Sequence, residues 1–388
     1  MMADWKECTI ADLGTVVGGA TPSTKDPENY NGGKIPWITP KDLSNFSDRY
    51  ISSGERSITE KGLNGCSTQL IPRHSVLFTS RAPIGYVAIA ENDVCTNQGF
   101  KSVVPNERTD FLFLYYLLKY NKDRIEGLGS GTTFKEISGS TMRGVTVRVP
   151  ESLEVQKAIG RYLDSIDTKI ETNRRINENL LQQASAVFDK FYEESPNQQP
   201  FTSMIDVLGG GTPKTGNPDF WNGPIPFFTP KDVGTPYTFQ TEKNITESGL
   251  AHCNSRLYQE NTTFVTARGT VGKVSLAGTP MAMNQSCYAL ASDTTDPLLV
   301  YFYVLKAVAS LKHKASGAVF DAIVTRDFAS ESINRLSDDD SKLVLSIIRP
   351  MMDAIHTNSE ENMRLAALRD SLLPRLMSGE LDVSELDF

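Results

Sequence analysis

The sequence has few of the residues that usually carry catalysis or bind metals. Four histidines are scattered along the 388 residues, and the five cysteines form no CxxC pair. It contains no complete phosphate-binding loop, no GxGxxG dinucleotide loop between a strand and a helix, and no nuclease-like set of acidic residues and lysine. We therefore expect a non-catalytic chain that itself holds no cofactor and no metal.

Long apolar runs are also missing. No segment approaches the ~18 apolar residues that can cross a membrane, and residues 1–7 lack the pattern of a signal peptide. Cys66 and Cys253 occupy equivalent positions of an internal repeat, which predicts small, buried residues retained by packing. We expect a cytoplasmic protein with reduced thiols.

The net charge is −8, but the acidity is confined to two segments. Residues 151–195 contain six Lys/Arg and nine Asp/Glu, and residues 338–388 contain five and eleven. The remaining chain is nearly neutral. A neutral domain can still present a basic face to a nucleic acid, although composition alone does not show one.

The most informative feature present is an internal duplication. The pattern TP-x-T…P…NG…IP…TPKD at 21–42 returns at 212–232 with an offset of 190–191, and SRAPIG at 80–85 returns as ARGTVG at 267–272 with an offset of 187. The order is kept over more than a hundred residues. The chain therefore contains two homologous domains and not the short repeats of a solenoid, which run roughly 20–50 residues.

Each copy has a globular part followed by a helical part. The globular parts carry short strand-like runs separated by Pro, Gly and Asn, with one-sided apolar helices at 110–120 and 296–311. Apolar positions at 151–192 and again at 337–379 step by four and three, as in a coiled coil. We expect two mixed α/β (α+β) domains at 1–150 and 201–336, long helices at 151–193 and 337–380, a linker at 194–200 and a tail at 381–388.

Two amphipathic helices of matching length most simply bury their apolar stripes against each other. The polar Asn173, Asn177 and Asn362 in these stripes would then fix the register. The alternative is that each helix packs only on its own domain. We favour an antiparallel coiled coil, because a helix of ~60 Å overhangs a domain of ~140 residues. Such a pair would relate the two copies by an approximate two-fold axis.

Recurring polar residues are candidate nucleic-acid contacts. Lys41 and Lys231 in the TPKD strings are equally well explained as phosphate contacts or as parts of a turn capped by Asp. Arg81 and Arg268 lie on glycine-containing loops, where an arginine suits bidentate contact with a phosphate or a guanine; a salt bridge that supports the loop is the alternative.

Two further groups complete the candidate set. The Asn-Gln pairs at 97–98 and 284–285 can pair with adenine, but a hydrogen-bonding scaffold explains them at least as well. Polar loops near 129–135 and 312–320 differ between the copies, as domains that read different sequences require. The candidate DNA-binding residues are Lys41, Ser80, Arg81, Asn97, Gln98, Ser130, Thr132, Thr133, Lys135, Lys214, Lys231, Arg268, Lys273, Asn284, Gln285, Lys312, Lys314 and Ser316.

These patterns together resemble the specificity subunit of a type I restriction-modification system. Both domains open with the TP-x-T…TPKD pattern and are followed by a heptad helix. The stretch 180–188 resembles the central conserved region of that family, and LLPRLMSGEL at 372–381 resembles its C-terminal ending. The likeness covers essentially the whole chain.

The resemblance implies a division of labour. The globular parts would be target recognition domains that each read half of a split double-stranded DNA target from the major groove. The paired helices would set the gap between the half-sites and dock two methylation subunits, which carry S-adenosylmethionine; restriction/translocase subunits would join them. Two other functions stay open: a single-chain DNA-modifying enzyme with unrecognised motifs, or an assembly scaffold that binds no DNA.

Overall fold

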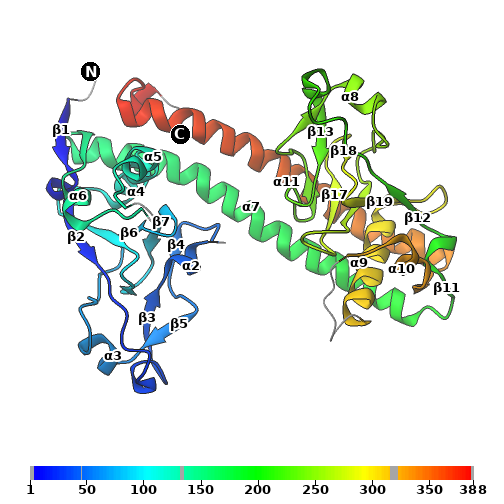
Figure 1. Cartoon of the computed structure of the whole chain (residues 1–388), viewed down its shortest axis with the longest axis horizontal. Helices are drawn as coiled ribbons and strands as arrows, with labels where there is room; N and C mark the ends of the chain where they lie inside the picture. Colours follow the sequence, from blue (N-terminus) through cyan, green and yellow to red (C-terminus); the bar gives the residue numbers. More distant parts are fainter. Residues whose placement is uncertain (1–3, 45, 132–134, 315–321, 386–388) are drawn as a thin grey trace. The chain divides into compact units, whose positions relative to one another are not determined.

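The computed structural model describes residues 4–44, 46–131, 135–314 and 322–385. It divides into two compact units, the first made of Met1–Glu171 and Arg364–Phe388, the second of Thr172–Met363. Each unit contains one globular domain together with a part of each long helix (Figure 1).

The first globular domain contains a five-stranded mixed sheet in the order β2-β9-β6-β7-β4. β4 pairs with β7 in parallel, and the other pairs are antiparallel. A smaller sheet has the order β5-β3-β8, and β1 pairs with β10. The strands are β1 (Trp5–Thr9), β2 (Gly14–Gly18), β3 (Ile35–Ile38), β4 (Tyr50–Ile51), β5 (Arg56–Ile58), β6 (Val76–Ser80), β7 (Ile84–Ala90), β8 (Cys95–Thr96), β9 (Lys101–Pro105) and β10 (Thr146–Pro150).

Helix α4 (Phe111–Tyr120) is the buried centre of this domain. The side chain of Asp110 accepts the Phe113 N–H at 2.9 Å and so caps the helix where the sequence predicts its start. Residues 112–118 are all buried, because the helix packs between the large sheet and a long helix. The shorter helices are α1 (Ile10–Leu13), η1 (Pro27–Asn29), α2 (Pro40–Leu43), α3 (Glu60–Asn64), α5 (Lys122–Gly127) and α6 (Gly139–Arg143).

The second globular domain repeats this plan strand for strand. Its sheets have the orders β12-β19-β16-β17-β14, β15-β13-β18 and β11-β20. The elements are β11 (Gln198–Pro200), η2 (Phe201–Ser203), β12 (Asp206–Gly209), η3 (Pro218–Phe220), β13 (Trp221–Phe228), β14 (Tyr237–Thr238), β15 (Asn244–Ile245), α8 (Glu247–Ala251), β16 (Thr263–Thr266), β17 (Val274–Ala277), β18 (Ala282–Met283), β19 (Cys287–Ala291), α9 (Pro297–Lys314), α10 (Thr325–Ala329) and β20 (Ser332–Asn334). The expected pair of mixed α/β domains is confirmed.

The long helices are α7 (Leu153–Glu194) and α11 (Asp338–Ser378), 42 and 41 residues long, and a short turn η4 (Val383–Glu385) follows α11. They run antiparallel and contact each other in both units (Figure 1). In the first unit Arg369 Nη1 lies 2.6 Å from Asp167 Oδ1, and in the second Asn173 donates to Asn362 at 2.9 Å. The expected pairing of the helices is therefore present.

Buried asparagines interrupt the apolar stripe of α7. Asn173 is 1% exposed, and its amide also donates to Glu361 Oε2 at 2.6 Å. Asn177 accepts from Asn358 at 2.8 Å and donates to Ser359 Oγ at 3.2 Å. These bonds form only in one register of the two helices, so the asparagines act as the register-fixing residues that the heptad pattern predicts.

A glycine lets the first domain approach α7 closely. A Cβ at Gly160 would lie 2.8 Å from the Phe113 nitrogen and 2.9 Å from Asp110 Oδ1. The start of α4 therefore rests directly on the backbone of α7.

The expected burial of Cys66 and Cys253 is wrong. Both are only partly buried, and their thiols point to the carbonyls of the preceding short helices at 3.5 Å. The fully buried thiols belong to Cys95 and Cys287, which lie in sheets. Within the described ranges, no helix has the length and apolar character needed to cross a bilayer.

Candidate nucleic-acid interface

The aspartate of each TPKD string ties two loops together. Asp42 Oδ2 accepts the N–H and the hydroxyl of Thr39, both at 2.7 Å, while its Oδ1 accepts the Glu55 N–H at 2.7 Å. Asp232 makes the same three bonds to Thr229 and Glu242, at 2.8, 2.6 and 2.7 Å. The capping role considered for this aspartate is thus present in both domains.

The lysine of each string remains at the surface. Lys41 Nζ lies 2.6 Å from Glu55 Oε2, and Lys231 Nζ lies 3.5 Å from Glu242 Oε2. Their side chains are 77% and 79% exposed. An exposed lysine on a structured loop is accessible to a phosphate. Because exposed ion pairs are weak, the lysine can exchange its carboxylate partner for a phosphate at little cost in free energy.

The residue that follows the carboxylate partner of each lysine places its cation over an aromatic ring. Arg56 Cζ is 4.1 Å from the centroid of the Tyr30 ring, and Lys243 Nζ is 5.7 Å from that of Trp221. The two pairs occupy equivalent repeat positions, at offsets of 187 and 191. These residues are not among those predicted from the sequence, although a cation and an aromatic residue recur at these positions of the duplication.

The arginine loops are held by a buried threonine. Thr79 Oγ1 donates to Pro83 O and accepts the Tyr86 N–H, both at 2.8 Å. Thr266 Oγ1 donates to Thr270 O and accepts the Lys273 N–H at 3.0 Å. Each threonine closes the loop between two sheet strands, and each loop carries the recurring arginine two residues after the threonine.

A lysine also covers the same loop in each domain. Gly85 and Gly272 have positive φ values of 93° and 71°, and a Cβ on either would lie 2.5 Å from a carbon of Lys122 or Lys312. Lys312 Nζ donates to Gly272 O at 2.6 Å. Burial, followed by the nearby charge of Lys273, lowers the pKa of Lys312. Lys122 is not among the residues predicted from the sequence, because the repeat offset of 186–187 on both sides of it does not align it with Lys312.

In the first domain four candidate residues come together around Glu136. Its carboxylate lies 3.6 Å from both Arg81 Nη1 and Lys101 Nζ. Its backbone exchanges two hydrogen bonds with Ser130, at 3.1 and 2.9 Å, which closes the loop that contains Lys135. The Lys101 ammonium lies 3.5 Å from Ser80 Oγ. The candidates Thr132 and Thr133 lie outside the described residues.

In the second domain three candidates line one pocket of about 410 Å³. Lys231, Arg268 and Asn284 contribute to its wall, and Trp221 and Phe227 contribute aromatic surface. Lys214 does not line the pocket itself, although Thr212 and Thr215, on either side of it in the sequence, do. The Arg268 loop reaches the TPKD loop through Thr270 Oγ1, which donates to Pro230 O at 3.3 Å.

Other candidates have contacts within the fold. Asn97 and Asn284 each accept a backbone N–H two residues on, at 2.8 and 3.0 Å, as in an Asx-turn. The side-chain oxygens of Gln98 and Gln285 accept from the hydroxyls of Thr21 and Thr212. Lys314 lies 2.5 Å from the buried carboxylate of Glu331, and Ser316 lies outside the described residues.

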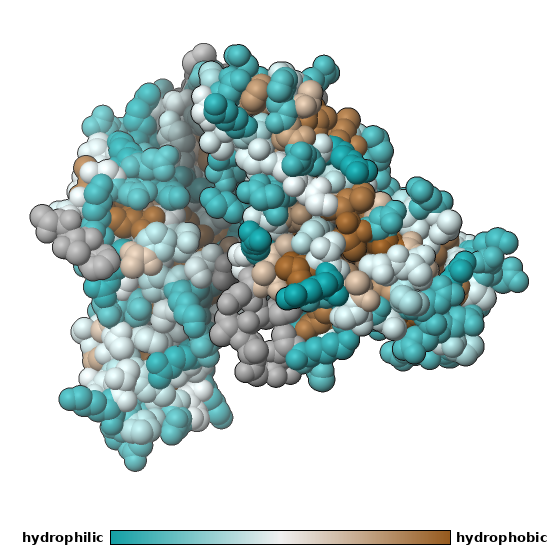
Figure 2. Space-filling view, turned by 45° about the vertical axis from the view of Figure 1, so that its right-hand side comes forward, coloured by the Kyte–Doolittle hydropathy of each residue, from teal (hydrophilic) through white to brown (hydrophobic). Residues whose placement is uncertain are grey.

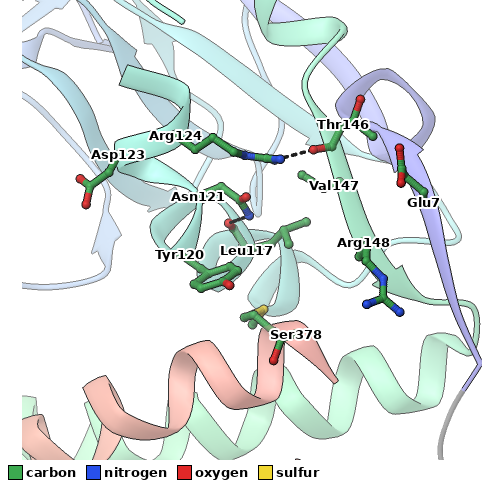
Figure 3. Close-up of a pocket in the computed structure, with 11 residues that line it drawn as sticks. Glu7, Leu117, Tyr120, Asn121, Asp123, Arg124, Thr146, Val147, Arg148 and Ser378 are labelled. Carbon is green, nitrogen blue, oxygen red and sulfur yellow. Dashed lines mark hydrogen bonds between the residues drawn. The ribbon is translucent and has the colours of Figure 1, made fainter. Parts of the chain in front are cut away.

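A larger pocket lies elsewhere, in the first unit (Figure 3). It has a volume of about 610 Å³ and is formed by the ends of α4 and α11 together with α5, β1 and β10. Glu7 and Arg148 are paired in register on its two antiparallel strands, and Arg124 donates to the Thr146 carbonyl. It contains no histidine or cysteine, and none of the candidate DNA-binding residues lines it. Among the described residues, no cluster of three or more His, Cys, Asp or Glu is arranged to hold a metal ion.

Comparison with known proteins gives a consistent result. The family model of the type I restriction modification DNA specificity domain matches residues 2–182 and again 201–362. A type I restriction enzyme MjaIX specificity subunit from Methanocaldococcus jannaschii is 32% identical over 99% of this chain and 95% of its own. The EcoR124I/EcoR124II specificity subunit of Escherichia coli is 29% identical over 42% of this chain and 41% of its own.

A solved structure has the same fold. The S subunit of a type I restriction-modification system from M. genitalium aligns over 97% of this chain and 96% of its own, with a TM-score of 0.63 at 15% identity. Because the family model matches both repeats and the M. jannaschii relative is similar from end to end, the chain belongs to the type I restriction-modification DNA specificity family.

Proposed function

We propose that this chain is the DNA-specificity subunit of a type I restriction-modification complex and that each globular domain recognises one half of a bipartite target. One observation carries the proposal: the family model matches each repeat separately, and each repeat presents an arginine on an equivalent, threonine-closed loop. Two equivalent reading surfaces are what a split target needs. The exposed lysines near these loops supply phosphate contacts that set position without reading sequence.

The long helices serve as the docking surface for methylation subunits, two of which we expect. Their segments carry most of the net negative charge, which disfavours contact with phosphates and suits protein partners. Apolar side chains are exposed on α11, with Leu343 50% and Ile347 36% accessible. Apolar residues reach the surface in separate patches among polar ones (Figure 2). In this proposal S-adenosylmethionine binds the methylation subunits, restriction/translocase subunits join the complex, and this chain performs no chemistry.

The test is to co-express the chain with methylation subunits and to sequence the methylated bases of the host genome. We expect methylation at a single motif of two short half-sites separated by a fixed gap, and none when this chain is omitted. Methylation without sequence preference would overturn the proposal in favour of an assembly scaffold. Binding of S-adenosylmethionine by the chain alone, together with methyl transfer, would favour the single-chain enzyme.

A further inference from the structure

The surroundings of the recurring arginine differ between the two domains although the backbone is the same. The Ile137 N–H donates to Ser80 O at 2.9 Å, and the Ile323 N–H donates to Ala267 O at 2.9 Å. Around this shared bond, three side chains change together. Ser80, Lys101 and Glu136 of the first domain correspond to Ala267, Tyr288 and Ala322 of the second.

In the first domain this change gives the arginine a carboxylate neighbour. The Arg81 and Glu136 side chains are 36% and 42% exposed, and their nearest charged atoms are 3.6 Å apart. That separation is longer than a hydrogen bond, so both groups can still turn their donors and acceptors toward a ligand. Lys101, only 15% exposed, lies 3.6 Å from the same carboxylate and balances its charge.

A phosphate offers only acceptors, so it can use the donors of Arg81 but leaves the acceptor of Glu136 beside them without a partner. The pair of Arg81 and Glu136 suits a base edge, which offers both acceptors and donors. In the major groove a G·C pair presents two acceptors on guanine, N7 and O6, next to the N4 amino donor of cytosine. A guanidinium supplies donors for the guanine, and an adjacent carboxylate accepts from the cytosine amino group. An A·T pair presents an acceptor, a donor and an acceptor in turn, which this arrangement does not match.

We infer that Arg81 and Glu136 together read a single G·C base pair in the half-site bound by the first domain, with Arg81 on guanine and Glu136 on cytosine. The inference rests on the proposed function and specifies it further. Arg268 has alanine at the position of Glu136, so the second domain lacks this paired reader.

The test uses the full chain assembled with its methylation subunits and a library of random-sequence DNA duplexes. Bound duplexes are sequenced for the wild-type protein and for Glu136→Ala, Arg81→Ala and the control Glu107→Ala, which removes an exposed carboxylate from the same domain. We expect both site variants to lose discrimination roughly tenfold at the same G·C pair of one half-site. The other half-site and the control should be unchanged.

A thermal unfolding curve for each variant separates misfolding from altered reading. If Glu136→Ala is unstable, Glu136→Gln keeps the shape and adds a donor, so it should admit other bases in place of the same cytosine. The inference is wrong if the two site variants relax different base pairs, if Glu136→Ala relaxes none, or if the shared position is an A·T pair. A wild-type protein that selects no bipartite sequence refutes the proposed function instead.

Discussion

The guanidinium of Arg49 donates two parallel hydrogen bonds to the carboxylate of Glu171, from Nε to Oε1 and from Nη2 to Oε2, both 2.9 Å long. Arg49 also bonds to Asp164 and donates to Thr168 Oγ1 at 2.9 Å, so one side chain from the first globular domain holds three residues of α7. Its side chain is 5% exposed. A bidentate pair buried in this way fixes orientation as well as position.

Replacing Arg49 by methionine should therefore destabilise the first unit by about 3 kcal/mol, because it leaves the partly buried carboxylates of Glu171 and Asp164 without their partner. Arg49→Lys keeps the positive charge but cannot form the bidentate pair of hydrogen bonds. Its free energy of unfolding should therefore lie between those of wild type and Arg49→Met. The measurement is urea unfolding of the full chain. The pair of Lys157 and Glu154, whose side chains are 33% and 79% exposed, supplies the control, since Lys157→Met removes an equal charge from a more accessible ion pair and should change the midpoint little. Equal effects of the two methionine variants would contradict the prediction.

The helix pair of the second unit gives another stability prediction. Asn173→Leu removes the donor to Asn362 and Glu361 from an almost fully buried position, which should cost about 1–3 kcal/mol despite the added apolar surface. Asn179→Leu, at an exposed position of the same helix, should change the free energy of unfolding by less than about 0.5 kcal/mol. Circular dichroism during chemical denaturation measures both. A leucine at 173 that stabilises the protein would show that the asparagine serves register alone.

Thiol reactivity should divide the cysteines into two groups. Burial raises the pKa of the Cys95 thiol to about 11 and that of Cys287 to about 12. At pH 8 an aromatic disulfide reagent should therefore label Cys8, Cys66 and Cys253 quickly, and the two buried thiols only after denaturation. Rapid labelling of all five in the native protein would rule out this arrangement.

The same two thiols predict how stability depends on pH. Their folded pKa values are raised above the ordinary value near 9, so the folded state favours the neutral thiol. The resulting stabilisation is complete below about pH 9 and is lost as the pH rises toward 11 and 12. Urea midpoints of wild type and a Cys95→Ser variant, compared at pH 8 and pH 10.5, test this. Wild type should lose more stability over that interval than the variant; an equal loss would contradict it.

Salt dependence should identify phosphate contacts in the second domain. Lys273 is exposed beside the Arg268 loop, and its charge lies near that of Lys312. If it neutralises one phosphate, Lys273→Ala should reduce the slope of log affinity against log salt by roughly 0.9 for duplex DNA. Lys342, which is 80% exposed on α11, provides the control and should leave the slope unchanged. The assay is titration of the assembled complex with its selected duplex at several salt concentrations.

The sequence predicts the repeated scaffold well, because each signal is local. Asp110 marks the start of α4, and the polar interruptions at Asn173 and Asn177 mark the register of the long helices. The sequence predicts less about which side chains of the long helices pack on a globular domain instead of on the other long helix. Phe188 is fully buried, yet the heptad pattern did not select it, because it stacks at 5.3 Å on Phe302 of its own globular domain. That contact depends on tertiary packing.

The candidate interface was harder to predict for the same reason. The loops that carry Arg81 and Arg268 were recognisable from their glycines and their recurrence. The partner of Arg81 was not, because Glu136 reaches it only through the backbone pairing with Ser130 and the bond from Ile137 to Ser80. Arg81 and Glu136 are 55 positions apart in the sequence, and no periodic pattern predicts a contact over that separation.

The bond between the Ile137 N–H and the Ser80 carbonyl, like that between Ile323 and Ala267, uses main-chain atoms alone. Any residue except proline at the donor position can form this hydrogen bond. The backbone conformation of the loops that carry Arg81 and Arg268 therefore does not depend on the neighbouring side chains. If these loops read the target as proposed, point substitutions at a few positions change the target without changing the backbone of the loop. Under the same proposal, positions 80, 101 and 136, with their counterparts 267, 288 and 322, are the ones to vary in a library designed to retarget each half-site separately.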